Sequence, residues 1–215
     1  MPWNTQEKVS SRQAVREGES KTDHYEDILG TYLVKLSTQK MGRDESEEAT
    51  ELLKTIGDFE RISDHAVNIL ESAEELRAKG LTFSRAAQSE LDVLSRAVRD
   101  ILQLALRAFR EKDTTAAGQV EPLEQVIDKL KDKLRTNHIA RLQRGECSLA
   151  AGFVLSDLLT NLERVADHCS NIAVSLIETS AGSFDTHEYL SEVKEGGSKD
   201  YTDLYHAYTK KYALQ

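Results

Sequence analysis

The sequence contains one acidic motif twice, once in each half of the chain. The first copy, ERISDHAVNI, covers residues 60–69, and the second copy, ERVADHCSNI, covers residues 163–172. Six of the ten positions are identical, and most of the shared residues are polar. A helix that only presents a solvated face does not need to keep particular polar residues. The repetition therefore indicates a repeated site.

Carboxylates four residues apart in a helix point to the same side, and the chain holds four such pairs. One pair lies in each copy of the motif, and one lies on the helix expected before each copy. The four pairs are Asp23 and Asp27, Glu60 and Asp64, Glu124 and Asp128, and Glu163 and Asp167. When Asp27 is aligned with Asp128, the leucines that follow them also coincide. Each half is therefore expected to form the same helical hairpin.

Folding each hairpin is expected to bring its two acidic pairs to the same height. The turns are predicted at Gly42 and Gly145, because glycine commonly ends helices. Each turn lies close to the midpoint between the two pairs of its hairpin. We therefore expect four contacts across the hairpins: Asp27 with Glu60, Asp23 with Asp64, Asp128 with Glu163, and Glu124 with Asp167.

Converging carboxylates repel one another, and removing water from around them raises that cost. Protonation or bound cations would relieve the repulsion. Ligation by oxygen alone suits hard or borderline cations, so the candidates are divalent or trivalent ions such as Mg, Ca, Mn or Fe. The eight carboxylates are accordingly predicted to bind metal. The alternative is that they form ordinary solvated helix faces.

The other polar residues of the motif are expected to play supporting roles. Arg61 and Arg164 are rotated by about 100° from the acids that precede them, which favours contacts with neighbouring helices over ion pairs with these acids. His65 and His168 are also turned away from the acidic pairs. We therefore expect both histidines to be hydrogen-bonded packing residues rather than ligands.

The composition predicts an all-helical protein. Its 215 residues include only two prolines and eleven glycines, with 39% hydrophobic and 30% charged residues, as expected for long helices with few loops. An excess of 37 acidic over 28 basic residues makes nucleic-acid binding a poor expectation. The sequence shows no signal peptide and no apolar run that could cross a bilayer. We expect a cytoplasmic protein, or one tethered to the inner face of the cell membrane by a missing N-terminal transmembrane region.

Apolar spacing and capping residues predict the individual helices. A helical fragment over residues 6–18 is expected to precede helices at about 20–41, 44–79, 83–112, 115–144 and 148–178. Asp44 is expected to cap the second of these helices. A helical stretch near Asp185 and an amphipathic, tyrosine-rich piece that docks on the bundle follow. These elements form a first repeat over 1–80 with a partial first helix, a second repeat over 81–180, and a C-terminal tail over 181–215.

A hairpin with an acidic-x-x-x-Asp pair on one arm and the Glu-Arg motif on the other resembles the PhoU family of phosphate-regulation proteins. The resemblance covers about residues 19–180, and it is specific because both halves carry both features. It implies tandem three-helix bundles, the first truncated at its N-terminus, in a non-enzymatic regulator that acts on a membrane phosphate transporter. It also implies multinuclear metal clusters, with iron or zinc, on the eight carboxylates.

Two features look different from a free-standing member of this family, namely the partial first helix and the tyrosine-rich tail. Both look more like the cytoplasmic C-terminal domain of bacterial sodium/phosphate cotransporters. The transporter is therefore expected either in the same full-length polypeptide or as a separate partner, and a homodimer is compatible with the sequence. A carboxylate-bridged metalloenzyme and a plain helical scaffold remain as alternatives. The enzyme is disfavoured, because no general base or nucleophile stands near the acids in the sequence.

Overall fold

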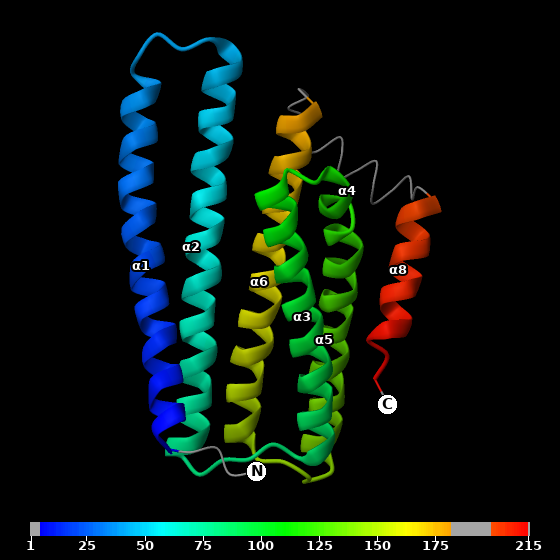
Figure 1. Cartoon of the computed structure of the whole chain (residues 1–215). Helices are drawn as coiled ribbons and strands as arrows, with labels where there is room; N and C mark the ends of the chain where they lie inside the picture. Colours follow the sequence, from blue (N-terminus) through cyan, green and yellow to red (C-terminus); the bar gives the residue numbers. More distant parts are fainter. Residues whose placement is uncertain (1–4, 182–198, 215) are drawn as a thin grey trace.

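The computed structural model describes residues 5–181 and 199–214, and all regular elements there are helices (Figure 1). The first half is a long hairpin, and the second half is a three-helix bundle with one short connecting helix and a docked tail helix. The hairpin consists of α1 (Thr5–Ser37) and α2 (Arg43–Ala78), the bundle of α3 (Arg85–Glu111), α5 (Val120–Gln143) and α6 (Leu149–Ala181), the connection of α4 (Thr114–Ala117), and the tail of α8 (Lys199–Lys211).

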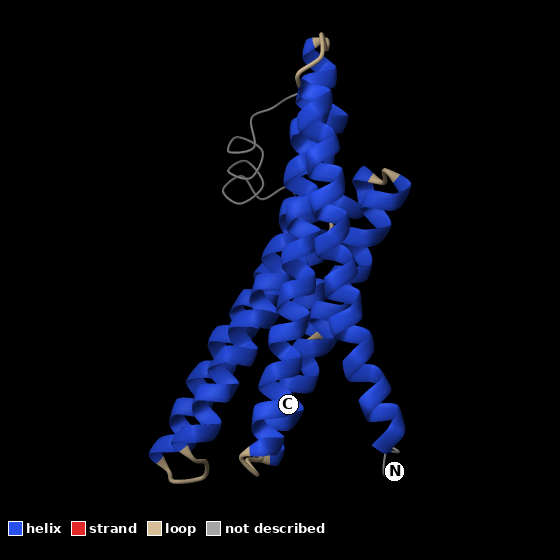
Figure 2. Ribbon diagram, turned by 90° about the vertical axis from the view of Figure 1, so that its left-hand side faces the viewer, coloured by secondary structure: helices blue, strands red, loops and turns tan. Residues whose placement is uncertain are grey.

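Helices α2 and α6, which carry the two copies of the motif, pack against each other and join the halves. Helix α1 packs on the outer side of α2, and α8 packs on α5 (Figure 1). Figure 2 shows that the long helices spread apart towards one end of the molecule. Within residues 5–181 and 199–214, no helix combines the length and apolar character needed to span a bilayer.

Local signals in the sequence explain most helix boundaries. The Ser84 hydroxyl accepts a hydrogen bond from the backbone N–H of Ala87 and so caps α3. The Asp113 carboxylate caps α4 in the same way. Gly80 and Gly145 adopt positive φ angles of 61° and 70° where α2 and α5 have ended, a conformation that glycine reaches without steric cost.

Two expected boundaries are wrong. Helix α1 is continuous from Thr5, with no break between the predicted fragment and the predicted helix. An interior glycine costs about 1 kcal/mol but does not end a helix, and Arg16 ties this segment to α2 through Glu71 and Glu74. Helix α2 is not capped by Asp44. Its N-cap is Gly42, whose N–H donates to the side chain of Glu45 at 2.9 Å. The stretch predicted near residue 185 lies outside the described residues.

The hydrophobic core lies in the second half. Helices α3, α5 and α6 interlock through fully buried aliphatic side chains, among them Leu94, Ile101, Ile127, Leu155 and Leu159. The apolar spacing that predicted these helices also gives each of them a continuous buried stripe. The residue that follows the tail helix, Tyr212, adds to this core and is 2% exposed. An ion pair between Lys211 and Asp100 accompanies it.

The first half is less well covered. In the second half, α3 packs on both arms of the α5–α6 hairpin. No described helix packs on both arms of the α1–α2 hairpin in this way. The consequence is an exposed apolar stripe on α1, here called the α1 apolar face. Its members, spaced by three and four residues, are Tyr25, Ile28, Leu29 and Tyr32, each at least 43% exposed.

Candidate functional site

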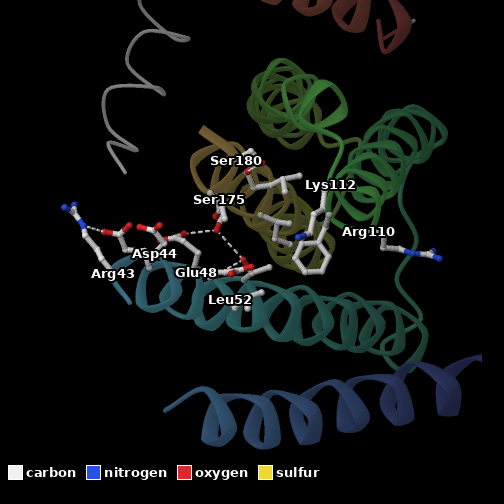
Figure 3. Close-up of a pocket in the computed structure, with 15 residues that line it drawn as sticks. Arg43, Asp44, Glu48, Leu52, Arg110, Lys112, Ser175 and Ser180 are labelled. Carbon is white, nitrogen blue, oxygen red and sulfur yellow. Dashed lines mark hydrogen bonds and ion pairs between the residues drawn. The ribbon is translucent and has the colours of Figure 1, made fainter. Parts of the chain in front are cut away.

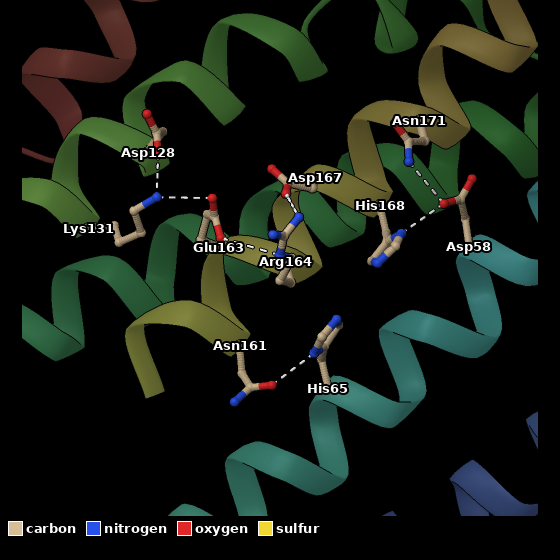
Figure 4. A network of polar contacts seen from close by, with 10 residues as sticks. All are labelled: Asp58, His65, Asp128, Lys131, Asn161, Glu163, Arg164, Asp167, His168 and Asn171. Atoms are coloured by element: carbon tan, nitrogen blue, oxygen red, sulfur yellow. Dashed lines mark hydrogen bonds and ion pairs between the residues drawn. The ribbon is translucent and has the colours of Figure 1, made fainter. Parts of the chain in front are cut away.

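The second hairpin brings two of the predicted site residues together around a lysine (Figure 4). Lys131 of α5 donates hydrogen bonds to Asp128 Oδ1 at 2.7 Å and to Glu163 Oε1 of α6 at 3.0 Å. Asp128 and Glu163 thus approach each other at the height that the hairpin predicts. Burial lowers the pKa of Lys131, but the two hydrogen bonds outweigh burial and raise that pKa above its ordinary value. The ammonium therefore stays charged between the two carboxylates.

Arg164 extends this network along α6. Its guanidinium donates to Asp167 Oδ2 at 3.1 Å, and its Nε lies 3.9 Å from Glu163 Oε2 (Figure 4). The expectation that Arg164 serves a neighbouring helix is therefore wrong, because the three-residue spacing lets the arginine fold back along its own helix. Burial, followed by the charge of Glu163, raises the pKa of Asp167 above its usual range despite the arginine.

The first hairpin has a different electrostatic environment. Burial raises the pKa of Glu60, and the charge of Asp64 and a hydrogen bond with Asp64 raise it further. A smaller contribution comes from Glu26 on α1. Arg61 lies 3.8 Å from Glu60 and is 66% exposed, so it offers only weak compensation. The expectation that Arg61 serves a neighbouring helix is also wrong. The acidic pairs of both hairpins therefore carry an electrostatic cost, but only the pair of the second hairpin has a lysine from the neighbouring arm beside it.

The remaining predicted site residues do not complete the expected clusters. Asp23 and Asp27 are exposed. The α1 acid whose charge contributes to the raised pKa of Glu60 is Glu26. The better-buried stripe of α1 contains Glu26 and Leu33. Successive side chains of a helix point about 100° apart, so Asp27 lies outside that stripe. Glu124 lies near Tyr201 of α8, where burial and the acids Glu121 and Glu124 raise the tyrosine pKa to about 12.

The carboxylates therefore fit a multinuclear metal cluster poorly. Among residues 5–181 and 199–214, no group of three or more His, Cys, Asp or Glu side chains is arranged to hold a metal ion. What the two hairpins offer instead is one close carboxylate pair in the first and one lysine-bridged pair in the second. Multinuclear sites need more converging oxygens than either pair supplies.

The two motif histidines hold α2 and α6 together, as expected for packing residues. Their rings stack with centroids 5.6 Å apart. His65 Nδ1 lies 2.8 Å from Asn161 Oδ1 across the interface, and His168 Nδ1 lies 2.8 Å from Asp58 Oδ1 (Figure 4). Asn171 also donates to Asp58. The arrangement is a symmetric cross-brace, in which each motif reaches over to the helix of the other.

Three residues of the site were not predicted from the sequence, namely Asp58 and Asn161 of the cross-brace and Lys131 of the second hairpin. Asp58 and Asn161 occupy the same position in the two repeats, two residues before each motif. Extending the repeat alignment by two residues would have identified both as a matched polar position. Lys131 could have been found from its three-residue spacing to Asp128, because residues at this spacing meet on a helix.

A cavity of about 1020 Å³ lies between α2, α3 and α6 (Figure 3). Its lining includes cations such as Arg43 and Lys112 together with several acids. Glu51, the buried acid of this lining, accepts a hydrogen bond from Ser175 and pairs with Lys54. The lining combines both charges, and Glu51 is already satisfied within the chain, so the cavity favours no single class of ligand.

Glu60→Gln is expected to make folding less sensitive to pH. Because the raised pKa means that the folded state holds this proton more tightly than the unfolded chain, the free energy of unfolding falls as pH rises through that window. The variant should therefore exceed the wild type by a few tenths of a kcal/mol at pH 7. This difference in the free energy of unfolding between the variant and the wild type should vanish near pH 3. Urea unfolding at both pH values measures it, with exposed Asp23→Asn as the control. A wild type that is more stable at pH 7 would contradict this reading.

Comparison with known proteins gives a consistent family assignment. The family model described as the PhoU domain matches residues 5–73 and 91–176, which include both copies of the motif. A PhoU homolog of the phosphate-specific transport system from Thermotoga maritima is 30% identical over 67% of this chain and 61% of its own length. A second such homolog, from Borreliella burgdorferi, is 25% identical over 78% of this chain and 77% of its own length.

The solved structures add the fold. The crystal structure of PhoU from Pseudomonas aeruginosa superposes with a TM-score of 0.74, at 22% identity, over 80% of this chain and 82% of that one. This confirms the predicted all-helical architecture. The chain spans about three fifths or less of the first three curated relatives that it matches.

Proposed function

Because this chain belongs to the PhoU family, we propose that it is a regulatory protein of phosphate transport that acts on a membrane phosphate transporter. The family match to both repeats carries this proposal. It is supported by relatives that are named as accessory proteins of the phosphate-specific transport system. The site of action would be the cytoplasmic side of the membrane.

The proposed role is non-enzymatic. The polar residues of the two motifs are engaged with one another as ion pairs and as the cross-brace, which suits a structural or regulatory element. Elsewhere, the Cys147 sulfur lies 3.8 Å from His138 Nδ1, a pairing that could suggest a nucleophile. Burial lowers the pKa of His138, so the imidazole favours its neutral form and gives little support to a thiolate.

We also propose that cations regulate this protein through its first hairpin. Glu60 and Asp64 would be the main ligands, and Glu26 and Asp27 of α1 would approach on binding. A cation such as Mg, Mn, Ca, Fe or Zn would relieve the repulsion between Glu60 and Asp64, which adds to the effect of burial in raising the pKa of Glu60. Among residues 5–181 and 199–214, no group of three or more His, Cys, Asp or Glu side chains is already arranged to hold an ion, so binding would require the acids of α1 to move towards Glu60 and Asp64.

The surface proposed to meet the transporter is the α1 apolar face. The residues aligned with Tyr25 and Leu29 in the second repeat are Val126 and Leu130, which are at most 8% exposed and belong to the core. The first-repeat residues are instead open to a partner. Exposed apolar stripes of this kind mark interaction surfaces, and a helix of the transporter would cover it as α3 covers the second hairpin.

Phosphate uptake in cells that lack the gene tests this function. Supplying the wild-type chain should restore the normal dependence of radiolabelled phosphate uptake on external phosphate. Tyr25→Ser combined with Leu29→Ser should fail to restore it while keeping the helical content. Leu149→Ser combined with Phe153→Ser changes apolar residues of α6 that are at least as exposed and should act like the wild type. Uptake that does not depend on the gene would contradict the proposal.

A second candidate is the cytoplasmic domain of a sodium-dependent phosphate cotransporter. It is favoured by α8, which lies outside the matched family residues and packs on α5. The Tyr205 hydroxyl of α8 accepts a hydrogen bond from Lys129 of α5 at 2.6 Å. An antibody against this chain distinguishes the two arrangements. A free-standing regulator gives a band in the soluble fraction, whereas the cotransporter gives a band in the membrane fraction.

A further inference from the structure

At one aligned position, the two repeats differ in a charge that lies close to their acids. Aligning Asp27 with Asp128 places Gly30 opposite Lys131. The second hairpin therefore contains a lysine at the point where the first hairpin has no side chain. A Cβ built on Gly30 would meet nothing within 4 Å, so space for a side chain exists there as well.

In the second repeat, Lys131 places a positive charge between two of the acids. Its Nζ lies within hydrogen-bond distance of Asp128 on its own helix and of Glu163 on α6. Only 14% of the lysine side chain and 17% of the Glu163 side chain are exposed. Charged hydrogen bonds in such sheltered positions are the stronger ones. The ammonium thus supplies the positive charge that an ion would bring to these oxygens.

The first repeat has no equivalent of this ammonium among its described residues. The basic group that approaches Glu60 is Arg61, which is mostly exposed and 3.8 Å away. Asp64 lies four residues after Glu60 on the same side of α2, so the acidic pair itself is kept in this repeat. Glu163 thus has a sheltered ammonium beside it, whereas the cation beside Glu60 is an exposed guanidinium.

We infer that Lys131 is a built-in cation that takes the place of a metal ion in the second repeat. The residues of that repeat consequently do not fit the metal cluster that the family resemblance implies, and the first repeat alone responds to added divalent cations. This inference refines the cation-binding part of the proposed function. Lys131 acts here as a specificity-determining residue, because it excludes a metal from one of two otherwise similar acidic faces.

Thermal unfolding with and without Mn²⁺ tests the inference. Lys131→Met keeps the apolar stem of the side chain but leaves Asp128 and Glu163 facing each other without a cation. Its Tm should be lower than that of the wild type without divalent ions. Mn²⁺ at about ten times its Kd should then raise its Tm by roughly 3–6 °C beyond the wild-type response, because one new ion binds only the folded state.

Further variants serve as controls for this experiment. Lys131→Arg keeps the charge and should respond like the wild type, while adding Glu163→Gln to Lys131→Met should remove the gained response. Gly30→Lys should reduce the response of the wild type by placing an ammonium in the first repeat. An equal Mn²⁺ response in Lys131→Met and the wild type would overturn the inference, as would a wild-type response that Glu163→Gln abolishes. Neither result depends on phosphate uptake, which tests the proposed function separately.

Discussion

Glu90→Ala is expected to lower the free energy of unfolding by about 3–5 kcal/mol, because it leaves a buried guanidinium without its partner. Glu90 of α3 accepts hydrogen bonds from both terminal nitrogens of Arg141 on α5, at 2.9 and 2.8 Å. It also accepts one from the side-chain amide of Asn137. The arginine side chain is only 5% exposed. Water therefore cannot replace the lost carboxylate, and the charge remains in the interface between the two helices.

Urea unfolding measures this effect, and two further variants separate its causes. Glu146→Ala removes the partner of Arg144 in an exposed pair and should cost no more than about 1 kcal/mol. Adding Arg141→Met to Glu90→Ala removes the stranded charge and should recover most of the loss. If Glu90→Ala and Glu146→Ala cost the same, the Glu90–Arg141 pair does not support the bundle in the way described.

Leu155→Ala is expected to cost about 2–5 kcal/mol, because it opens a cavity in the closed second bundle. Leu155 of α6 is 2% exposed and belongs to the hydrophobic core. The residue at the same position of the first repeat is Leu52 of α2, which is 38% exposed. Leu52→Ala should therefore cost less than about 1 kcal/mol.

This pair of variants compares the same side chain at matched positions of the two repeats. The comparison is made by urea unfolding of both variants beside the wild type. A clear difference would show that the second bundle holds most of the stability, while the first hairpin remains open for a partner. Equal losses would mean that the α1–α2 hairpin is as well covered as the α5–α6 hairpin, contrary to the structure.

Much of the fold could be predicted from the sequence because its signals are local. Ser84, Asp113, Gly80 and Gly145 all act through their own backbone or the next turn, so their roles do not depend on the rest of the molecule. The continuity of α1 could not be predicted in this way. It depends on ion pairs from Arg16 to α2, which exist only after the hairpin has formed.

The candidate site shows the same division between local and tertiary information. Counting residues from the turn correctly places Asp128 opposite Glu163. The corresponding expectation for Asp27 and Glu60 stays a prediction: Asp27 is exposed, and the charge of Glu26 on α1 contributes to the raised pKa of Glu60. Whether the eight acids ever bind metal stays a prediction.

The repeats keep their framework but differ in charge and covering. The histidine cross-brace between α2 and α6 uses matched residues from both halves, including Asp58 and Asn161. The acidic faces have diverged through a single lysine, and the outer faces have diverged through the helix that covers only the second half. A protein built in this way has one stable bundle and one hairpin that is open to an ion or a partner.

Carbon-13 NMR of the side-chain carboxyl groups during titration with Mg²⁺ tests the central claim most directly, because it reads each acidic face separately. The unequal charge of the two repeats predicts saturable shifts of the Glu60 and Asp64 signals. The signals of Asp128 and Glu163 should stay unchanged while Lys131 lies between them. Shifts of equal size at Glu163 and Glu60, or a Glu60 signal that does not respond to Mg²⁺, would contradict the claim.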